Sequence, residues 1–162
     1  MQVCWEKFCR YFDVEPRLVP LTPDNFKLDV ARAKKMCDEN TIGMCGILGS
    51  TYTGARRVRG TWEWCANSCS TTPLTPSGCF DDIEAMDKAS EELRAEKGWE
   101  VPIHVDAASG GFTAPFLEPD LKWDFRLKNV VSINVSGHKY GACWLGPAEH
   151  CWCGQTLPRH LS

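Results

Sequence analysis

The spacing of apolar and polar positions along the chain predicts three helices. Residues 2–12 carry apolar side chains at helical spacing with charged residues between them. In the segment 28–40, Asp29 stands where a helix N-cap is expected, before an apolar face of Val30, Ala33 and Cys37. A third helical pattern covers residues 81–98 and ends at Gly98. Its apolar face consists of Ile83, Met86, Ala89 and Leu93.

Short runs with few charged residues predict strands. Residues 41–50, "TIGMCGILGS", are typical of a buried strand followed by a loop. A short strand that ends in small residues is expected within 101–111, "VPIHVDAASGG", and another near 130–135. Because buried strands are separated by helices, we expect an α/β fold with a mostly parallel sheet and flanking helices.

Two segments show neither period and differ from the rest in composition. Residues 55–78 are rich in Ser, Thr, Pro, Gly and Cys and are expected to form a loop. Residues 142–162 are expected to be an atypical, irregular tail. Cys65 and Cys69 have the spacing of half a zinc site, but neither a second pair nor a histidine lies nearby, so no metal is expected.

Length and charge restrict the classes of function. A chain of 162 residues suits one domain or a piece of a larger one. The net charge of −3 and the lack of a long basic run argue against a nucleic-acid partner. No apolar run approaches the roughly 18 residues of a membrane span, and the charged N-terminus is not a secretion signal. The ten cysteines are therefore interpreted as reduced thiols, and the protein is expected to be cytoplasmic.

In parallel sheets, ligands bind beyond the carboxyl ends of the strands. Three polar side chains lie at such ends of the expected strands: Thr51, Asp106 and Lys139. Alone, Asp106 is also explained as a turn cap and Lys139 as solvated surface. Together they suggest pyridoxal phosphate, which needs a lysine amine for a Schiff base and an acid beside its ring nitrogen. Such an acid favours the protonated ring, which draws electrons from a bond breaking at the substrate's α-carbon.

Longer stretches extend this hypothesis from a cofactor to a family. The stretch "IHVDAASGGFTAPFLEPDLKWDFRLKNVVSINVSGHKYG" resembles the glutamate decarboxylases of the pyridoxal-phosphate-dependent group II decarboxylase family, as do "QVCWEKFCRYFDVEP" and "DENTIGMCGILGSTYTG". The resemblance covers residues 2–54 and about 80–141. It implies part of the large domain of the aspartate-aminotransferase-like fold (fold type I). It also implies conversion of L-glutamate to 4-aminobutanoate and carbon dioxide.

The resemblance assigns roles to individual residues. Lys139 of "SGHKYG" matches the lysine that holds the cofactor through a Schiff base, and His138 matches a histidine near the cofactor phosphate. Asp106 of "HVDAASGG" matches the acid paired with the pyridine nitrogen. Ala108 matches the small residue against one face of the ring.

Two further matches also allow a purely structural role. Thr51 matches a threonine that lines the site near the cofactor and the substrate carboxylate. Gln2 matches a residue that packs over the other face of the ring.

The resemblance also divides the chain. Residues 1–141 are expected to be a partial cofactor-binding domain, interrupted at 55–78 by a non-family insertion, for which a translated intron is our hypothesis. The tail 142–162 lies outside the resemblance. Family members form homo-oligomers and have further segments before and after the region matched here, so this chain alone is expected to be inactive. The alternatives are another group II amino-acid decarboxylase and a non-catalytic truncated product.

Overall fold

The computed structural model describes residues 3–22, 27–49, 55–58, 61–64, 80–141 and 149–152. The helices are α1 (Val3–Tyr11), α2 (Val30–Met36), α3 (Ile83–Lys97) and α4 (Ala114–Leu117), with a 3-10 turn, η2 (Gly110–Phe112). The strands are β1 (Met44–Ile47), β2 (Ala55–Val58), β3 (Thr61–Trp64), β4 (Ile103–Asp106), β5 (Val130–Val135) and β6 (Glu149–Trp152).

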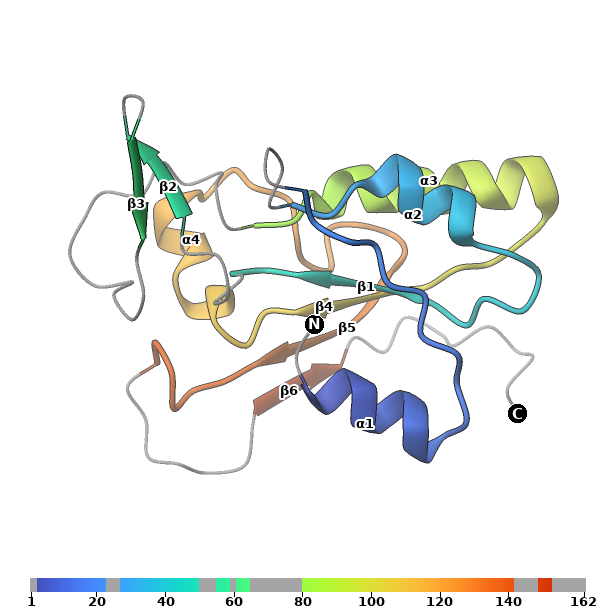
Figure 1. Ribbon diagram of the computed structural model, residues 1–162, viewed down its shortest axis with the longest axis horizontal. Coiled ribbons are helices and arrows are strands. Elements are labelled where there is room, and N and C mark those ends of the chain that lie inside the picture. Colours follow the sequence, from blue (N-terminus) through green and yellow to red (C-terminus); the bar gives the residue numbers. More distant parts are fainter. Residues whose placement is uncertain are drawn as a thin grey trace.

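The main sheet has four strands in the order β1-β4-β5-β6. The β1–β4 and β4–β5 pairs are parallel, and β6 runs antiparallel to β5. Helices α2 and α3 cover one face of this sheet, whereas α1 lies on the opposite side (Figure 1). The predicted α/β fold with a mostly parallel sheet is therefore confirmed.

The core lies between α3 and the sheet. Ile83, Met86 and Leu93 of α3 are almost completely buried, and each contributes roughly 1.5–3 kcal/mol by leaving water. On β1, a Cβ added to Gly46 would lie 2.5 Å from Ile83 Cδ1 and 2.8 Å from Met86 Sδ. A glycine at this position therefore lets the helix approach the strand closely.

The predicted helix ends are confirmed. Asp29 caps α2 by accepting a hydrogen bond of 3.0 Å from the backbone N–H of Arg32. Gly98 ends α3 in the left-handed region, with φ of 73°, and its N–H donates to the carbonyl of Arg94. Both ends follow from local chemistry, a side-chain acceptor at one and a missing Cβ at the other.

The two segments expected to be irregular are partly regular. Within 55–78, β2 and β3 form an antiparallel pair, and within 142–162, β6 pairs with β5. These strands have four residues each, too short for a period of two to be distinguished in the sequence. The rest of both segments lies outside the described residues, and their assignment as an insertion and a non-family tail stays a prediction. Across the described residues, no helix has the length and apolar character to cross a membrane.

Candidate functional site

Asp106 is the last residue of β4, and its side chain is buried. Its Oδ2 accepts a hydrogen bond of 2.9 Å from Trp5 Nε1 of α1. Its Oδ1 accepts one of 3.2 Å from the Ala108 backbone N–H and one of 3.2 Å from Asn134 Nδ2. The bond from Ala108 is the turn cap considered from the sequence. The other two donors come from distant segments, so Asp106 is more than a cap.

A row of polar side chains lies on the sheet face toward α1. His104 and Asp106 alternate on β4, and their register partners on β5 are Ser132 and Asn134. Paired residues of parallel strands project to the same face, so the four side chains form one cluster. Trp5 of α1 packs against His104 with the two rings in an edge-to-face arrangement, 5.0 Å between centroids.

Small residues join the ends of β1 and β4. The Gly110 N–H donates to the carbonyl of Leu48 at 2.8 Å, and a Cβ on Gly110 would lie 2.5 Å from that same oxygen. Gly49, next to the Leu48–Gly110 hydrogen bond, has a φ of 93°, a value that favours glycine. The segment after β1, which leads to Thr51, therefore begins beside the loop that follows Asp106.

Lys139 and His138 lie in the turn after β5, and both side chains are exposed. The Ser136 N–H donates to the carbonyl of Ala108 at 3.3 Å, and the Lys139 N–H donates to the carbonyl of Ser136 at 3.1 Å. These bonds tie the loop of the predicted lysine to the loop of the predicted acid. Within the described part of the chain, the Lys139 amine has no hydrogen-bond or ion-pair partner.

These residues fit pyridoxal phosphate. A carboxylate has about four acceptor positions, and Asp106 uses three, which leaves one on Oδ2 for a ring N–H. The amine of Lys139, without a partner among the described residues, is available for a Schiff base. Ala108 is half-buried and small, so it leaves room for a flat ring.

The structure places four of the six predicted site residues at the end of β4 or in the two linked loops that follow β4 and β5: Asp106, Ala108, His138 and Lys139. The other two, Gln2 and Thr51, lie outside the described residues. Sequence reasoning missed Trp5, His104 and Asn134. The alternation in "HVD" and "SIN" was a signal for the latter two, but only the strand register shows that the two alternations face each other.

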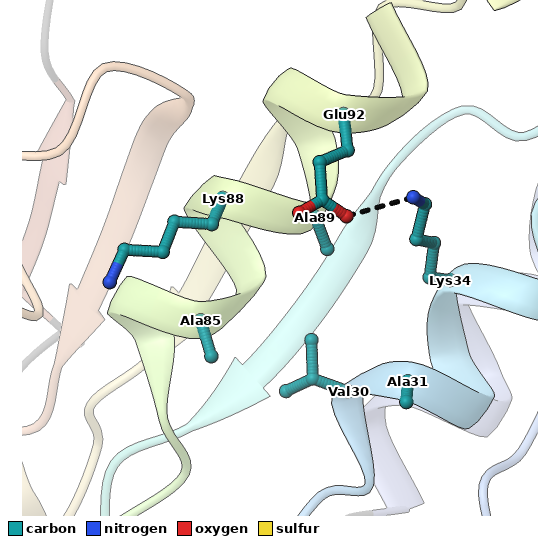
Figure 2. Close-up of a pocket in the computed structure, with 7 residues that line it drawn as sticks. All are labelled: Val30, Ala31, Lys34, Ala85, Lys88, Ala89 and Glu92. Carbon is teal, nitrogen blue, oxygen red and sulfur yellow. Dashed lines mark hydrogen bonds and ion pairs between the residues drawn. The ribbon is translucent and has the colours of Figure 1, made fainter. Parts of the chain in front are cut away.

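A groove of about 360 Å³ lies on the other side of the sheet, between α2 and α3. Figure 2 shows Lys34 above Val30 and Ala31, with its amine directed toward Glu92. Glu92 and Glu96 accept from this amine at 2.8 and 3.0 Å, and these bonds raise the pKa of Lys34. An amine held in its charged form is a poor nucleophile, so Lys34 is a weaker candidate for a Schiff base than Lys139.

Comparison with known proteins agrees with this geometry. The profile of the pyridoxal-dependent decarboxylase conserved domain matches residues 64–154. The structure superimposes on glutamate decarboxylase of Lactobacillus brevis with a TM-score of 0.72 and 43% identity, over 93% of this chain and 28% of that one. A sphingosine-1-phosphate lyase of Burkholderia pseudomallei, 23% identical, has a TM-score of 0.69 over 93% of this chain and 29% of its own, and shares the fold.

Fold and site together define the pyridoxal-phosphate-dependent class of fold type I, as predicted. The chain belongs to the pyridoxal-dependent decarboxylase family. It is 49% identical over 162 residues to glutamate decarboxylase 5 of Arabidopsis thaliana and 45% identical over 161 residues to glutamate decarboxylase beta of Listeria innocua. The alignments cover 99% of this chain but only 28% and 30% of those proteins. The family confirms the predicted cofactor.

Proposed function

We propose that the protein containing this chain decarboxylates L-glutamate to 4-aminobutanoate and carbon dioxide, with pyridoxal phosphate held on Lys139. The observation that carries this proposal is that the loop of Lys139, whose amine has no partner among the described residues, is bonded through its backbone to the loop after the buried Asp106, at the ends of adjacent parallel strands. The similarity to glutamate decarboxylases at 43–49% identity supports glutamate as the substrate.

The residues of this chain have separate tasks in the proposed mechanism. When bound, the cofactor supplies an electron-accepting ring for the bond that breaks at the α-carbon. Asp106 would hold the ring N–H on the remaining acceptor position of Oδ2, and its negative charge would favour the protonated ring. Lys139 would provide the covalent anchor, and Ala108 would pack against one face of the ring.

We also propose supporting roles for the other predicted residues. His138, exposed beside Lys139, would lie near the cofactor phosphate. Thr51 would line the site near the substrate carboxylate, and Gln2 would cover the second face of the ring. We further propose that the protein containing this chain forms homo-oligomers and is located in the cytoplasm.

Replacement of Lys139 by alanine tests this function in the complete protein. We expect Lys139→Ala to lose both the visible absorbance of the lysine-bound cofactor and the release of carbon dioxide from glutamate. The matched control is Lys128→Ala, which removes an exposed lysine paired with Glu91 at 3.2 Å just before β5. Lys128→Ala should keep both signals.

The two readouts test different parts of the proposal. A Lys139→Ala protein that keeps the absorbance band would show that another residue holds the cofactor. A wild-type protein that shows the band but releases carbon dioxide from an aromatic amino acid, and not from glutamate, would overturn the substrate assignment alone.

A further inference from the structure

We propose that His104 is a positioning residue that acts through Asn134 to fix the orientation of the Asp106 carboxylate toward the cofactor. This inference rests on the proposed role of Asp106. It concerns three side chains that no part of the sequence reasoning connected: His104, Asn134 and Ser132.

The geometry is a continuous chain of hydrogen bonds across two strands. Ser132 Oγ lies 2.7 Å from His104 Nδ1. His104 Nε2 lies 3.0 Å from Asn134 Oδ1, diagonally along β5. Asn134 Nδ2 then lies 3.2 Å from Asp106 Oδ1. The chain ends at the carboxylate that is proposed to face the pyridine ring.

The charge of Asp106 fixes the direction of each bond. An ionised carboxylate only accepts, so Asn134 must turn its NH₂ group toward Asp106 and its carbonyl oxygen toward His104. That oxygen also only accepts, so His104 must carry a proton on Nε2. In the neutral ring, Nδ1 then accepts from the hydroxyl of Ser132. With a neutral His104, one arrangement of protons satisfies all four side chains.

As a consequence, the two oxygens of Asp106 have different roles. Asn134 and the Ala108 N–H occupy Oδ1, so rotation of the carboxyl group would break two bonds. Oδ2, which receives one bond from Trp5, keeps the position available to the cofactor. His104 has no contact with the ring in this scheme. It holds Asn134, and Asn134 holds Asp106.

Trp5 shields this network. Its indole packs edge-on against the His104 ring, and its N–H reaches Asp106. Hydrogen bonds that are partly withdrawn from water are more costly to break without replacement, because the groups left behind stay unsatisfied. The ring of His104 therefore has a fixed orientation, and its proton has a fixed position on Nε2.

A matched pair of substitutions tests the inference in the complete protein. The side-chain amide of His104→Gln reaches about as far as Nε2 and can still donate to Asn134, whereas that of His104→Asn reaches only about as far as Nδ1. We expect His104→Asn to weaken pyridoxal phosphate binding by about fivefold to tenfold, the effect of one lost hydrogen bond. His104→Gln should stay within about twofold of the wild type. Equal affinities for the two variants would overturn the proposal.

A double-mutant cycle with Asn134→Leu shows whether His104 acts through Asn134. If it does, adding His104→Asn to Asn134→Leu should cause no further loss of cofactor affinity. Losses that multiply would mean that the histidine has only a general structural role, and would contradict the inference. The melting temperature of each cofactor-free variant reports on folding separately.

Asp106→Asn separates this inference from the proposed function. If Asp106→Asn binds the cofactor as tightly as the wild type, the proposed role of Asp106 is wrong. If it binds weakly while His104→Asn binds normally, only the positioning role of His104 is wrong. These measurements use no substrate, so the identity of the amino acid does not affect them.

A neutron crystal structure of the cofactor-loaded protein provides a direct check. We expect a deuteron on His104 Nε2, directed at Asn134 Oδ1. A histidine with its deuteron on Nδ1 alone would overturn the proposal, because the Asn134 amide would then have to present its donor to His104 rather than to Asp106.

Discussion

At the scale of single residues, Gly98 and Gly110 are required for different reasons, one for backbone conformation and the other for close packing. Gly98 occupies the left-handed region at the end of α3, and a Cβ there would meet nothing within 4 Å. Gly110 needs space, because its added Cβ would lie 2.5 Å from the backbone oxygen of Leu48. Backbone atoms cannot rotate away as a side chain can, so the contact between the ends of β1 and β4 depends on this glycine.

We therefore expect Gly110→Ala to be more harmful than Gly98→Ala. Overpacking at Gly110 should lower the free energy of unfolding by about 2–3 kcal/mol, against roughly 1 kcal/mol for the left-handed strain at Gly98. Only Gly110→Ala should also weaken cofactor binding, since it displaces the loop that carries Ala108. Denaturant unfolding and cofactor titration measure the two effects. Equal effects of both variants would contradict the packing argument.

At the scale of elements, α1 is attached to the sheet differently from α3. None of the nine residues of α1 is buried, whereas α3 places five residues in the core. The helix reaches the sheet through Trp5, which bonds to Asp106 and packs on His104. One indole thus connects a surface helix with the proposed cofactor acid.

Trp5→Phe should loosen α1 and leave the rest of the sheet intact. The substitution keeps an aromatic ring but removes the N–H donor to Asp106, a bond to a charged group. We expect the amides of residues 3–11 to exchange with deuterium about tenfold faster, with no change in α3. Phe8→Leu is the control, because Phe8 contacts Trp5 without a polar bond to the sheet. An unchanged exchange rate in Trp5→Phe would show that other contacts hold α1.

The segment after α1 is tied to the end of α2 by an ion pair. Arg17 bonds to the carboxylate of Asp38 and donates to the carbonyl of Met36 at 2.5 Å. The hydrogen bond from Arg17 is the largest cause that lowers the pKa of Asp38. A carboxyl group with a lowered pKa in the folded protein stabilises it above the pKa of the unfolded chain, and this contribution is lost as the pH falls through the lowered value.

The pH dependence of stability should therefore differ between the wild type and Asp38→Asn. Above the ordinary aspartate pKa of about 3.9 the wild type should have the higher melting temperature. The difference should shrink as the pH is lowered further, because protonation of Asp38 removes the ion pair. The effect is small, since Arg17 is exposed, Asp38 is partly exposed, and water screens the pair. A difference that grows at low pH would contradict this assignment.

At the scale of the whole molecule, the chain spans about 28–30% of the length of the curated relatives it matches. It also exposes large apolar side chains. Val3 and Tyr11 of α1 and the adjacent Phe12 are 61%, 75% and 70% exposed, and Phe116 of α4 is 85% exposed. Apolar surface of this kind is usually covered by other protein, either further chain or a second subunit.

We expect the 162-residue chain, expressed alone, to show weak or no cofactor absorbance and no decarboxylation. It should also bind a hydrophobic dye, whereas the complete protein should not, because the exposed apolar side chains would be covered there. Absorbance spectra, dye fluorescence and carbon dioxide release measure the three properties. Carbon dioxide release from glutamate by this chain alone would contradict the expectation.

Local chemistry made much of the fold predictable. The caps at Asp29 and Gly98 and the apolar periods of α1, α2 and α3 depend on residues within about one or two helical turns. The short strands β2, β3 and β6 were missed because four residues show too little of a period. Their pairing depends on a neighbouring strand, which composition does not reveal.

The sequence by itself determined the helices α1, α2 and α3, the strands β1, β4 and β5, the candidate acid Asp106 and the candidate anchor Lys139. Only the tertiary structure decided which side chains surround that acid. Trp5 and Asn134 reach it from positions 101 and 28 residues away, through helix docking and strand register. Spacing along a chain fixes which side of its own strand a residue faces. Which residue of another strand lies opposite is fixed by long-range pairing, and that pairing places Asn134 within hydrogen-bond reach of both His104 and Asp106.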